Sequence, residues 1–368
     1  MRTFILLLVI LSANVVAAQQ TIASGCDPEK ITTAPGSWIT YVDKNTRGLT
    51  PAELAAERKI IASIHQVFKD NYTPIGVTAS HSANYDINNS EVDTRHPNRF
   101  GHPYYYLLMN FPNYCKNGKF QKEDHSNATL TININTAPYY DTIAILDRDG
   151  EVNSNAHIGY HTLGRDYFPN GKWPDLSNGW YAYGGPDAQF TSNYSWWITG
   201  KGKELPFHYV TRKELLMKQI AVQQAYINSA KRIRDNKETQ NVYKQSNQLD
   251  YFLNAQNKLI ETLEKTKAAY QEDLGKKDEW LNEWAIIKSQ FKDGITRFVF
   301  VSLKDQECMV PVKPNPGYYN RNHSKSVPQF MTISLRVSEG ENHSVRALKK
   351  VIEDNIDKFI GLVDNAGK

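Results

Sequence analysis

Apolar residues recur at helical spacing in a segment that begins at Pro51 and stops at Asn71. Thr50 is a good N-cap residue, and Glu53 stands three positions after it, which is the spacing of a capping box. Proline is well tolerated in the first turn of a helix. The pattern therefore predicts a helix from Pro51 with the apolar face Leu54, Ile60, Ile61, Ile64, Val67 and Phe68.

From Ile75 to about Gly200 the pattern changes to strands and long loops. Residues 128–136 alternate apolar and polar side chains, which indicates a half-buried strand. Residues 142–151 predict a hairpin around an Asp-Arg-Asp-Gly turn. Residues 194–199 predict one more strand.

A second complete helix start lies at Thr211, where Glu214 closes the capping box. The helix is predicted to run from Arg212 into the mid-230s. Residues 249–274 carry apolar side chains at alternating steps of four and three, which is heptad spacing with two polar interruptions. A third amphipathic piece is predicted over residues 278–291. Together these segments predict an antiparallel helical hairpin or a three-helix layer.

The last part of the chain returns to strands. Residues 296–303 and 307–312 are predicted to pair as a hairpin, and residues 329–337 form a third strand. A final helix is expected after Asn342 or Ser344, with apolar residues on one side.

These elements predict an α+β fold. It contains an antiparallel sheet with a packed N-terminal helix, a long helical hairpin insertion and a C-terminal β-plus-helix segment. The expected boundaries are a signal peptide over residues 1–18, an α+β region over 19–211, the helical hairpin over 212–293, and C-terminal strands and a helix over 294–368. That last segment is a candidate to complete the N-terminal sheet.

Residues 1–18 have the layout of a secretory signal peptide, with Arg2, a short apolar run and small residues up to Ala18. The run is too short to span a bilayer, and no later stretch reaches the ~18 apolar residues of a spanning helix. We therefore expect a secreted or periplasmic protein without a transmembrane segment. The formal charge of +4 is spread over the whole chain and does not indicate a nucleic-acid partner.

The chain has three cysteines: Cys26, Cys115 and Cys308. An oxidising compartment favours one disulfide and one remaining thiol, and the sequence leaves the pairing open. Cys26 also follows Ala23-Ser24-Gly25, which loosely resembles a lipoprotein processing site, so lipid anchoring at Cys26 is the less favoured alternative.

Catalytic and metal-binding motifs are weak. His157 and His161 have the spacing of a zinc pair on a helix, but Gly159 lies between them and the local pattern predicts a strand or loop. Residues 147–151 match only part of a calcium loop, and the nucleophile elbow G-x-S-x-G is absent. We expect no metal and no cofactor, and the catalytic residues stay unknown.

Aromatic residues are concentrated in residues 167–197, among Gly, Asn, Asp and Pro. Flat rings on polar loops are suited to stacking on sugar rings or anchoring a protein partner, but they can equally fill a core beneath the loops. Adjacent residues on a strand point to opposite faces, so we expect one of the two neighbouring tryptophans to face outwards. The candidate ligand-binding residues are Trp180, Tyr181, Tyr183, Trp196 and Trp197.

Three stretches, residues 205–214, Pro35-Gly36-Ser37-Trp38 and Pro328-Gln329-Phe330, together resemble secreted proteins of Bacteroidota-type bacteria that have no assigned activity. The resemblance implies an exported bacterial protein and adds no functional residues. The favoured function is an exported binding or envelope-associated protein, with a carbohydrate or a protein as ligand. The alternative is an extracytoplasmic hydrolase whose site is assembled only in the fold, and the oligomeric state stays open.

Overall fold

A computed structural model describes most of the chain after its first 25 residues. The signal peptide and His157 lie outside the described residues, and so does the turn predicted at 147–150. The described residues are 26–27, 30–40, 49–85, 99–136, 141–142, 160–185, 194–200, 205, 207–315, 317–320, 322–324, 326–338 and 343–364.

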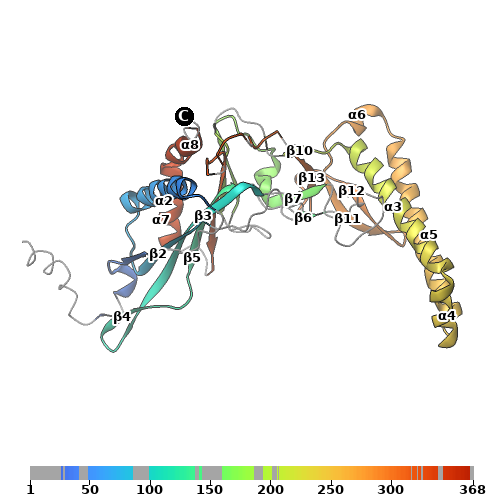
Figure 1. The fold of residues 1–368 in the computed structure, drawn as a ribbon, viewed down its shortest axis with the longest axis horizontal. Coiled ribbons are helices and arrows are strands. Elements are labelled where there is room, and N and C mark those ends of the chain that lie inside the picture. The colour runs from blue at the N-terminus through green and yellow to red at the C-terminus, as the bar shows by residue number, and fades with distance from the viewer. Residues whose placement is uncertain are drawn as a thin grey trace, which may run out of the picture.

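The predicted α+β class is confirmed, with antiparallel pairing dominant in two sheets (Figure 1). The first sheet has the strand order β1-β2-β3-β5-β14-β9-β8, and β4 pairs with β3. Only β1 and β2 run parallel among its pairs. The strands are β1 (Ser37–Thr40), β2 (Val77–Asn84), β3 (Arg99–Lys116), β4 (Lys119–Lys122), β5 (Ala128–Thr136), β8 (Trp180–Gly184), β9 (Tyr194–Ile198) and β14 (Met331–Val337).

Helices α2 (Pro51–Asn71), α7 (His343–Asp354) and α8 (Ile356–Asp364) bury one face of this sheet. The capping box at the start of α2 is confirmed, because Thr50 accepts from the Glu53 amide and Glu53 accepts from the Thr50 amide. The single C-terminal helix that we predicted is divided at Asn355, whose side-chain amide donates to Val351 O.

The second sheet has the order β12-β11-β13-β7-β6, and β10 pairs with β13. The predicted pairing of residues 296–303 with 307–312 is wrong, because β12 pairs with β11 across a tight turn. Asp293 and Gly294 adopt positive φ there, as a two-residue hairpin turn requires. The strands are β6 (Asp141–Thr142), β7 (His161–Gly164), β10 (Phe207–Tyr209), β11 (Ile287–Lys292), β12 (Ile295–Phe300) and β13 (Met309–Pro314).

The predicted antiparallel helical hairpin is present and projects away from the two sheets (Figure 1). It consists of α3 (Arg212–Asp235), the tip helix α4 (Lys237–Gln245) and α5 (Leu249–Leu274). The third amphipathic helix over 278–291 is wrong: only α6 (Asp278–Leu281) is helical, and the rest enters β11. The Asp-Gly turn after Lys292 stabilises a β-hairpin in place of a third helix.

Short 3-10 turns complete the described secondary structure: η1 (Ile31–Thr33), η2 (Arg165–Tyr167) and η3 (Pro169–Gly171). The last two lie between β7 and β8 and contribute Tyr167 and Phe168 to a core. In sequence, four of the six strands of the second sheet, β10 to β13, and the whole hairpin are inserted between β9 and β14, which are neighbours in the first sheet.

Cys26 and Cys115 form a disulfide with a Cα–Cα distance of 5.8 Å, and Cys308 is a buried free thiol. This disulfide occupies the sulfur that lipid anchoring at Cys26 would require. The disulfide fits an extracellular location. In the part of the chain that the structure describes, no helix has the length and apolar character needed to cross a bilayer.

Candidate functional site

The two neighbouring tryptophans of β9 point to opposite faces of the first sheet, as strand geometry requires. Trp196 packs into the core beneath the helices, and Trp197 packs on the other face against Phe207, with ring centroids 5.7 Å apart. Each indole is 2% exposed. The expectation of one outward tryptophan is therefore wrong, because both faces of the sheet are covered at this strand.

Tyr181 and Tyr183 of β8 lie on the same face as Trp197. The ring of Tyr183 stacks on Tyr167 at 4.7 Å, and the Tyr181 hydroxyl donates to Tyr167 O at 2.9 Å. Trp180 is half-buried and packs with the Trp196 core. The structure thus brings Tyr181, Tyr183 and Trp197 together and separates them from the other two predicted residues.

We call this cluster the aromatic joint, because it is a shared core of the two sheets. It combines side chains from β8 and β9 of the first sheet with others from β7, β10 and β13 of the second. Burying such rings is a large favourable contribution to folding. The joint therefore accounts for most of the aromatic segment through packing. Its buried members are Leu163, Tyr167, Phe168, Leu176, Tyr183, Trp197, Phe207, Leu303, Val310 and Val312.

A buried carboxyl group lies in the apolar face of α2. Glu57 has no exposed surface and accepts a hydrogen bond from Ser326 Oγ at 3.2 Å, while Tyr104 donates to Ser326 O at 3.0 Å. Burial raises the pKa of Glu57 to about 8, so the group is mostly protonated at neutral pH. Such a pKa is useful in acid catalysis, but a catalytic acid must also reach a substrate. Complete burial gives Glu57 a structural role.

Two imidazoles are stacked between α2 and β2. The rings of His65 and His81 lie 3.6 Å apart, and His65 Nδ1 is 3.1 Å from the Tyr106 hydroxyl. Burial lowers the pKa of His65 to about 4 and also lowers the pKa of His81. Ring nitrogen lone pairs lie in the ring planes, so two stacked rings do not aim them at one metal ion. The pair is neutral at physiological pH and packs as aromatic groups.

Metal-binding clusters of three or more His, Cys, Asp or Glu side chains do not occur among the described residues. The zinc pair considered from the sequence lies outside the described part, which includes neither His157 nor the side chain of His161. The same holds for the partial calcium loop at 147–151.

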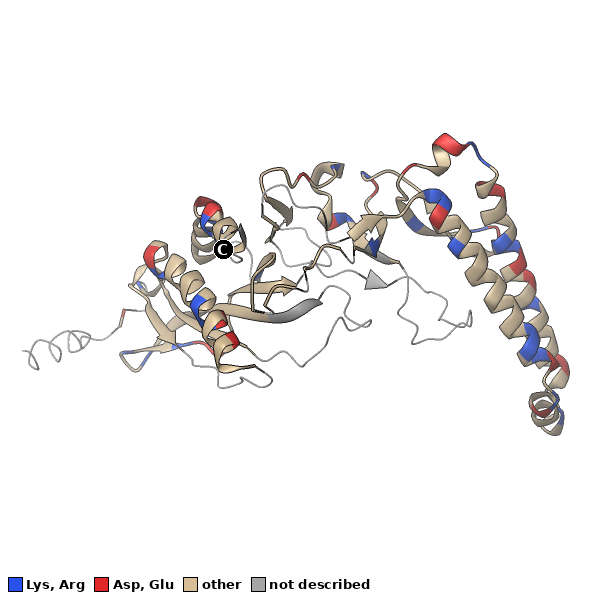
Figure 2. Cartoon of the chain, turned by 45° about the horizontal axis from the view of Figure 1, so that its top comes forward, with Lys and Arg blue, Asp and Glu red and all other residues tan. Residues whose placement is uncertain are grey.

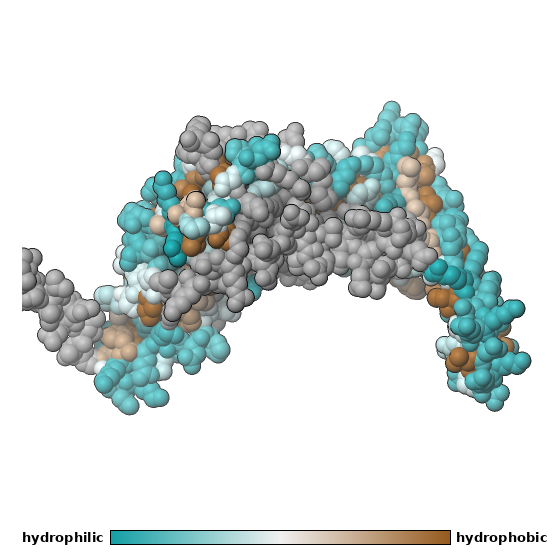
Figure 3. Space-filling view, viewed as in Figure 1, coloured by the Kyte–Doolittle hydropathy of each residue, from teal (hydrophilic) through white to brown (hydrophobic). Residues whose placement is uncertain are grey.

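A different surface stands out on the helical hairpin. Eight large apolar side chains are exposed among the described residues, and seven of them lie between residues 217 and 291. Figure 3 shows apolar atoms on the hairpin among hydrophilic ones. Three of the seven, Ile233, Leu259 and Phe291, line one groove. They are 45%, 46% and 74% exposed.

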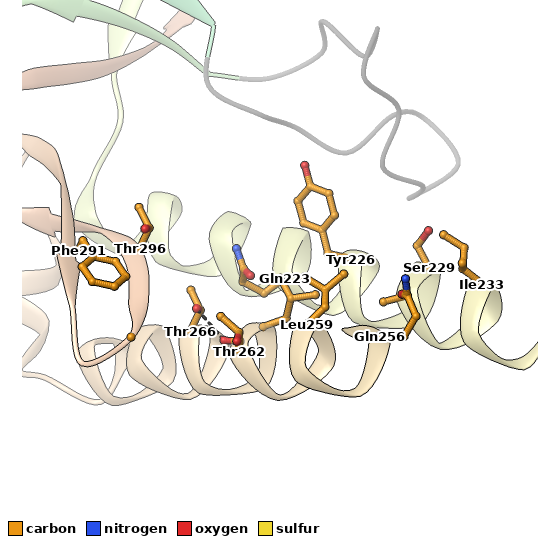
Figure 4. Close-up of a pocket in the computed structure, with 13 residues that line it drawn as sticks. Gln223, Tyr226, Ser229, Ile233, Gln256, Leu259, Thr262, Thr266, Phe291 and Thr296 are labelled. Atoms are coloured by element: carbon orange, nitrogen blue, oxygen red, sulfur yellow. Dashed lines mark hydrogen bonds between the residues drawn. The ribbon is translucent and has the colours of Figure 1, made fainter. Parts of the chain in front are cut away.

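This hairpin groove has a volume of about 610 Å³ and lies between α3, α5 and the β11–β12 turn (Figure 4). None of its lining residues is charged. The carbonyl oxygens Oε1 of Gln223 and Gln256 are buried in the groove and have no hydrogen-bond partner within the described residues. The lining consists of Gln223, Tyr226, Ser229, Ala230, Ile233, Gln256, Leu259, Thr262, Leu263, Thr266, Phe291, Gly294 and Thr296.

The opposite face of the hairpin carries charged and polar bridges between the helices. Lys267 Nζ donates to Gln224 Oε1 at 2.7 Å, and Lys231 lies 3.6 Å from Glu264. Figure 2 shows acidic and basic residues along the hairpin. Charged groups of this kind favour solvent. The two faces of the hairpin therefore differ. The face with the charged bridges is suited to solvent, and the opposite face is an uncharged groove.

Sequence reasoning missed both Glu57 and the groove. Glu57 stands three residues after Leu54 and four before Ile61, so it occupies an apolar position of the α2 pattern. For the groove, the signal is an apolar residue next to one heptad position of α5. Leu259 adjoins Ile260, which faces α3, and therefore extends the apolar surface around α5.

Comparison of the chain with protein families, with curated proteins and with solved structures found no match in any of the three. The arrangement of its residues is therefore the basis for assigning a function.

Proposed function

We propose that this chain is an exported binding protein that holds a protein partner on the uncharged groove of its helical hairpin. The concentration of exposed apolar side chains between residues 217 and 291 carries this proposal. Single exposed apolar residues are ordinary on protein surfaces, but a group that shares one groove is typical of an interaction site.

The groove is suited to a helical partner. Two packed antiparallel helices leave a furrow that a further helix can fill, with side chains at i, i+3, i+4 and i+7 as anchors. Tyr226 and Ile233 are seven residues apart on α3, and Leu259 and Thr266 are seven apart on α5. These spacings repeat at the heptad period along both walls.

Export is supported by the Cys26–Cys115 disulfide and by the signal-peptide layout of residues 1–18. A secreted or periplasmic location in a bacterial envelope is supported by these two features and by the resemblance to secreted Bacteroidota-type proteins. Lipid anchoring at Cys26 competes with the disulfide for the same sulfur.

The other sequence-based candidates gain less support. A carbohydrate site on the aromatic segment needs accessible ring faces, whereas Tyr183, Trp196 and Trp197 are buried. A hydrolase needs reactive groups in an open cleft, whereas the most perturbed carboxyl, that of Glu57, is completely buried.

Site-specific photo-crosslinking in cells that produce the full chain tests the proposal. A photoreactive residue replaces Leu259 in the groove, and a matched control replaces Met217, which is 56% exposed and lies seven residues before Gln224 on the charged face. Adducts with protein from position 259 and few from position 217 are the expected result. Equal yields, or no adduct from position 259, would remove the groove as the binding surface.

A further inference from the structure

We propose that the partner seated in the hairpin groove is a second copy of this chain, and that two hairpins pack face to face as an antiparallel four-helix bundle. The inference rests on the proposed function, because it names the occupant of the same groove. It is drawn from the charge, the register and the polar groups of the groove.

Charge is the first requirement for a symmetric contact. A twofold interface brings the same surface of both copies together, so a net charge on that surface repels the equal charge on its copy. The chain has a formal charge of +4, yet none of the residues that line the groove is charged. The charged bridges, such as Lys231–Glu264, lie on the other face and stay in solvent in such a dimer.

The register follows from contacts between α3 and α5. Ala230 and Leu263 pack in one cluster at the middle of the groove, and Arg234 Nη1 donates to Asn257 Oδ1 at 3.1 Å nearer the tip. At 1.5 Å per helical residue, Gln223 and Gln256 therefore lie about 20 Å apart along the hairpin, on either side of that middle. A twofold axis that crosses the hairpin between the levels of Ser229 and Ala230 brings Gln223 of one copy level with Gln256 of the other.

The two glutamines are chemically suited to this arrangement. Each has a buried Oε1 without a partner, and each side-chain amide also carries two N–H donors. Leaving a buried acceptor without a partner is unfavourable, so a surface that supplies donors there is favoured. A second copy supplies an amide N–H group at both places at once.

The apolar and small residues of the groove on α3 are also arranged symmetrically about this twofold axis. Tyr226 and Ile233 stand at equal distances from the axis on α3, so the ring of one copy meets the isoleucine of the other. Small residues near the axis, Ser229 and Ala230, allow the two α3 helices to approach closely.

Cysteine cross-linking tests this packing. Ser229 lies at the axis, where a residue faces its own copy, and a disulfide needs Cα atoms within about 7 Å. The Ser229→Cys chain, under mild oxidant, is expected to give a covalent dimer, whereas the control Asn228→Cys, exposed on the charged face, is expected to give none. Sedimentation equilibrium of the unmodified chain is expected to show a dimer that Leu259→Arg dissociates.

A monomer at every concentration tested would overturn the inference, and so would a dimer that Leu259→Arg leaves intact. The photo-crosslink from position 259 separates this failure from that of the proposed function. An adduct of twice the chain mass supports the second copy. An adduct of another mass overturns the second copy while keeping the groove as a binding surface, and the absence of any adduct overturns both.

Discussion

The substitution Glu57→Gln is expected to stabilise the protein by an amount that grows as the pH rises above about 4.5. Glu57 is fully buried in the apolar face of α2, and burial raises its pKa to about 8 from an ordinary value of 4.5. The folded state therefore keeps a proton that the unfolded chain releases above pH 4.5. The contribution of this group is fully present below pH 4.5 and is lost as the pH rises to about 8.

The size of the effect follows from the two pKa values. At 1.36 kcal/mol for each pH unit, the loss is about 3 kcal/mol by pH 7 and approaches about 5 kcal/mol above pH 8. Glutamine has nearly the same shape, cannot ionise, and offers a carbonyl oxygen to the Ser326 hydroxyl that donates to Glu57. The variant should therefore equal the unmodified protein at about pH 4.5 and exceed its stability progressively at higher pH.

Urea unfolding at several pH values between 5 and 8 measures this difference. The exposed Glu279→Gln serves as a control for the loss of a carboxylate and is expected to change little. If the free energies of unfolding of Glu57→Gln and the unmodified protein run parallel across this range, the assignment of a buried, protonated Glu57 is refuted.

Three further predictions concern the fold. Because burial lowers the pKa of His65 to about 4, its protonation between pH 6.5 and 4 favours the unfolded chain, so acidification should destabilise the protein and His65→Phe should reduce that loss in urea unfolding. Trp197→Ala in the aromatic joint should cost roughly 3–5 kcal/mol and the half-buried Trp180→Ala clearly less, and equal melting temperatures of the two variants would argue against the joint. Loss of the Cys26–Cys115 disulfide, which links residues 89 positions apart, should cost about 4 kcal/mol in Cys26→Ser/Cys115→Ser, and an unchanged melting temperature would contradict the pairing.

The sequence was most informative where local chemistry fixes local structure. The capping boxes at Thr50 and Thr211 predict the starts of α2 and α3, and both are present. The alternation in residues 128–136 predicts β5 in the same way. Capping boxes and strand alternation depend on residues within four positions of one another, so a short stretch of sequence is enough to predict these elements.

Long-range pairing was beyond the sequence. Residues 296–303 and 307–312 look like a hairpin, but β12 pairs with β11 and β13 pairs with β7, more than 140 residues away. The same limit applies to the candidate site. Whether Trp197 is a binding residue or part of a core depends on Phe207 and Val310, which belong to strands of the second sheet.

The accessibility of the groove tests the central claim most directly. Hydroxyl-radical footprinting of the full chain in its native envelope, against the purified chain at high dilution, measures the oxidation of Ile233, Leu259 and Phe291 relative to Met217 on the other face. If a partner covers the groove, these three side chains should react several-fold less in the envelope while Met217 stays unchanged. Equal reactivity in both states would show that the groove stays open to water and would contradict the account.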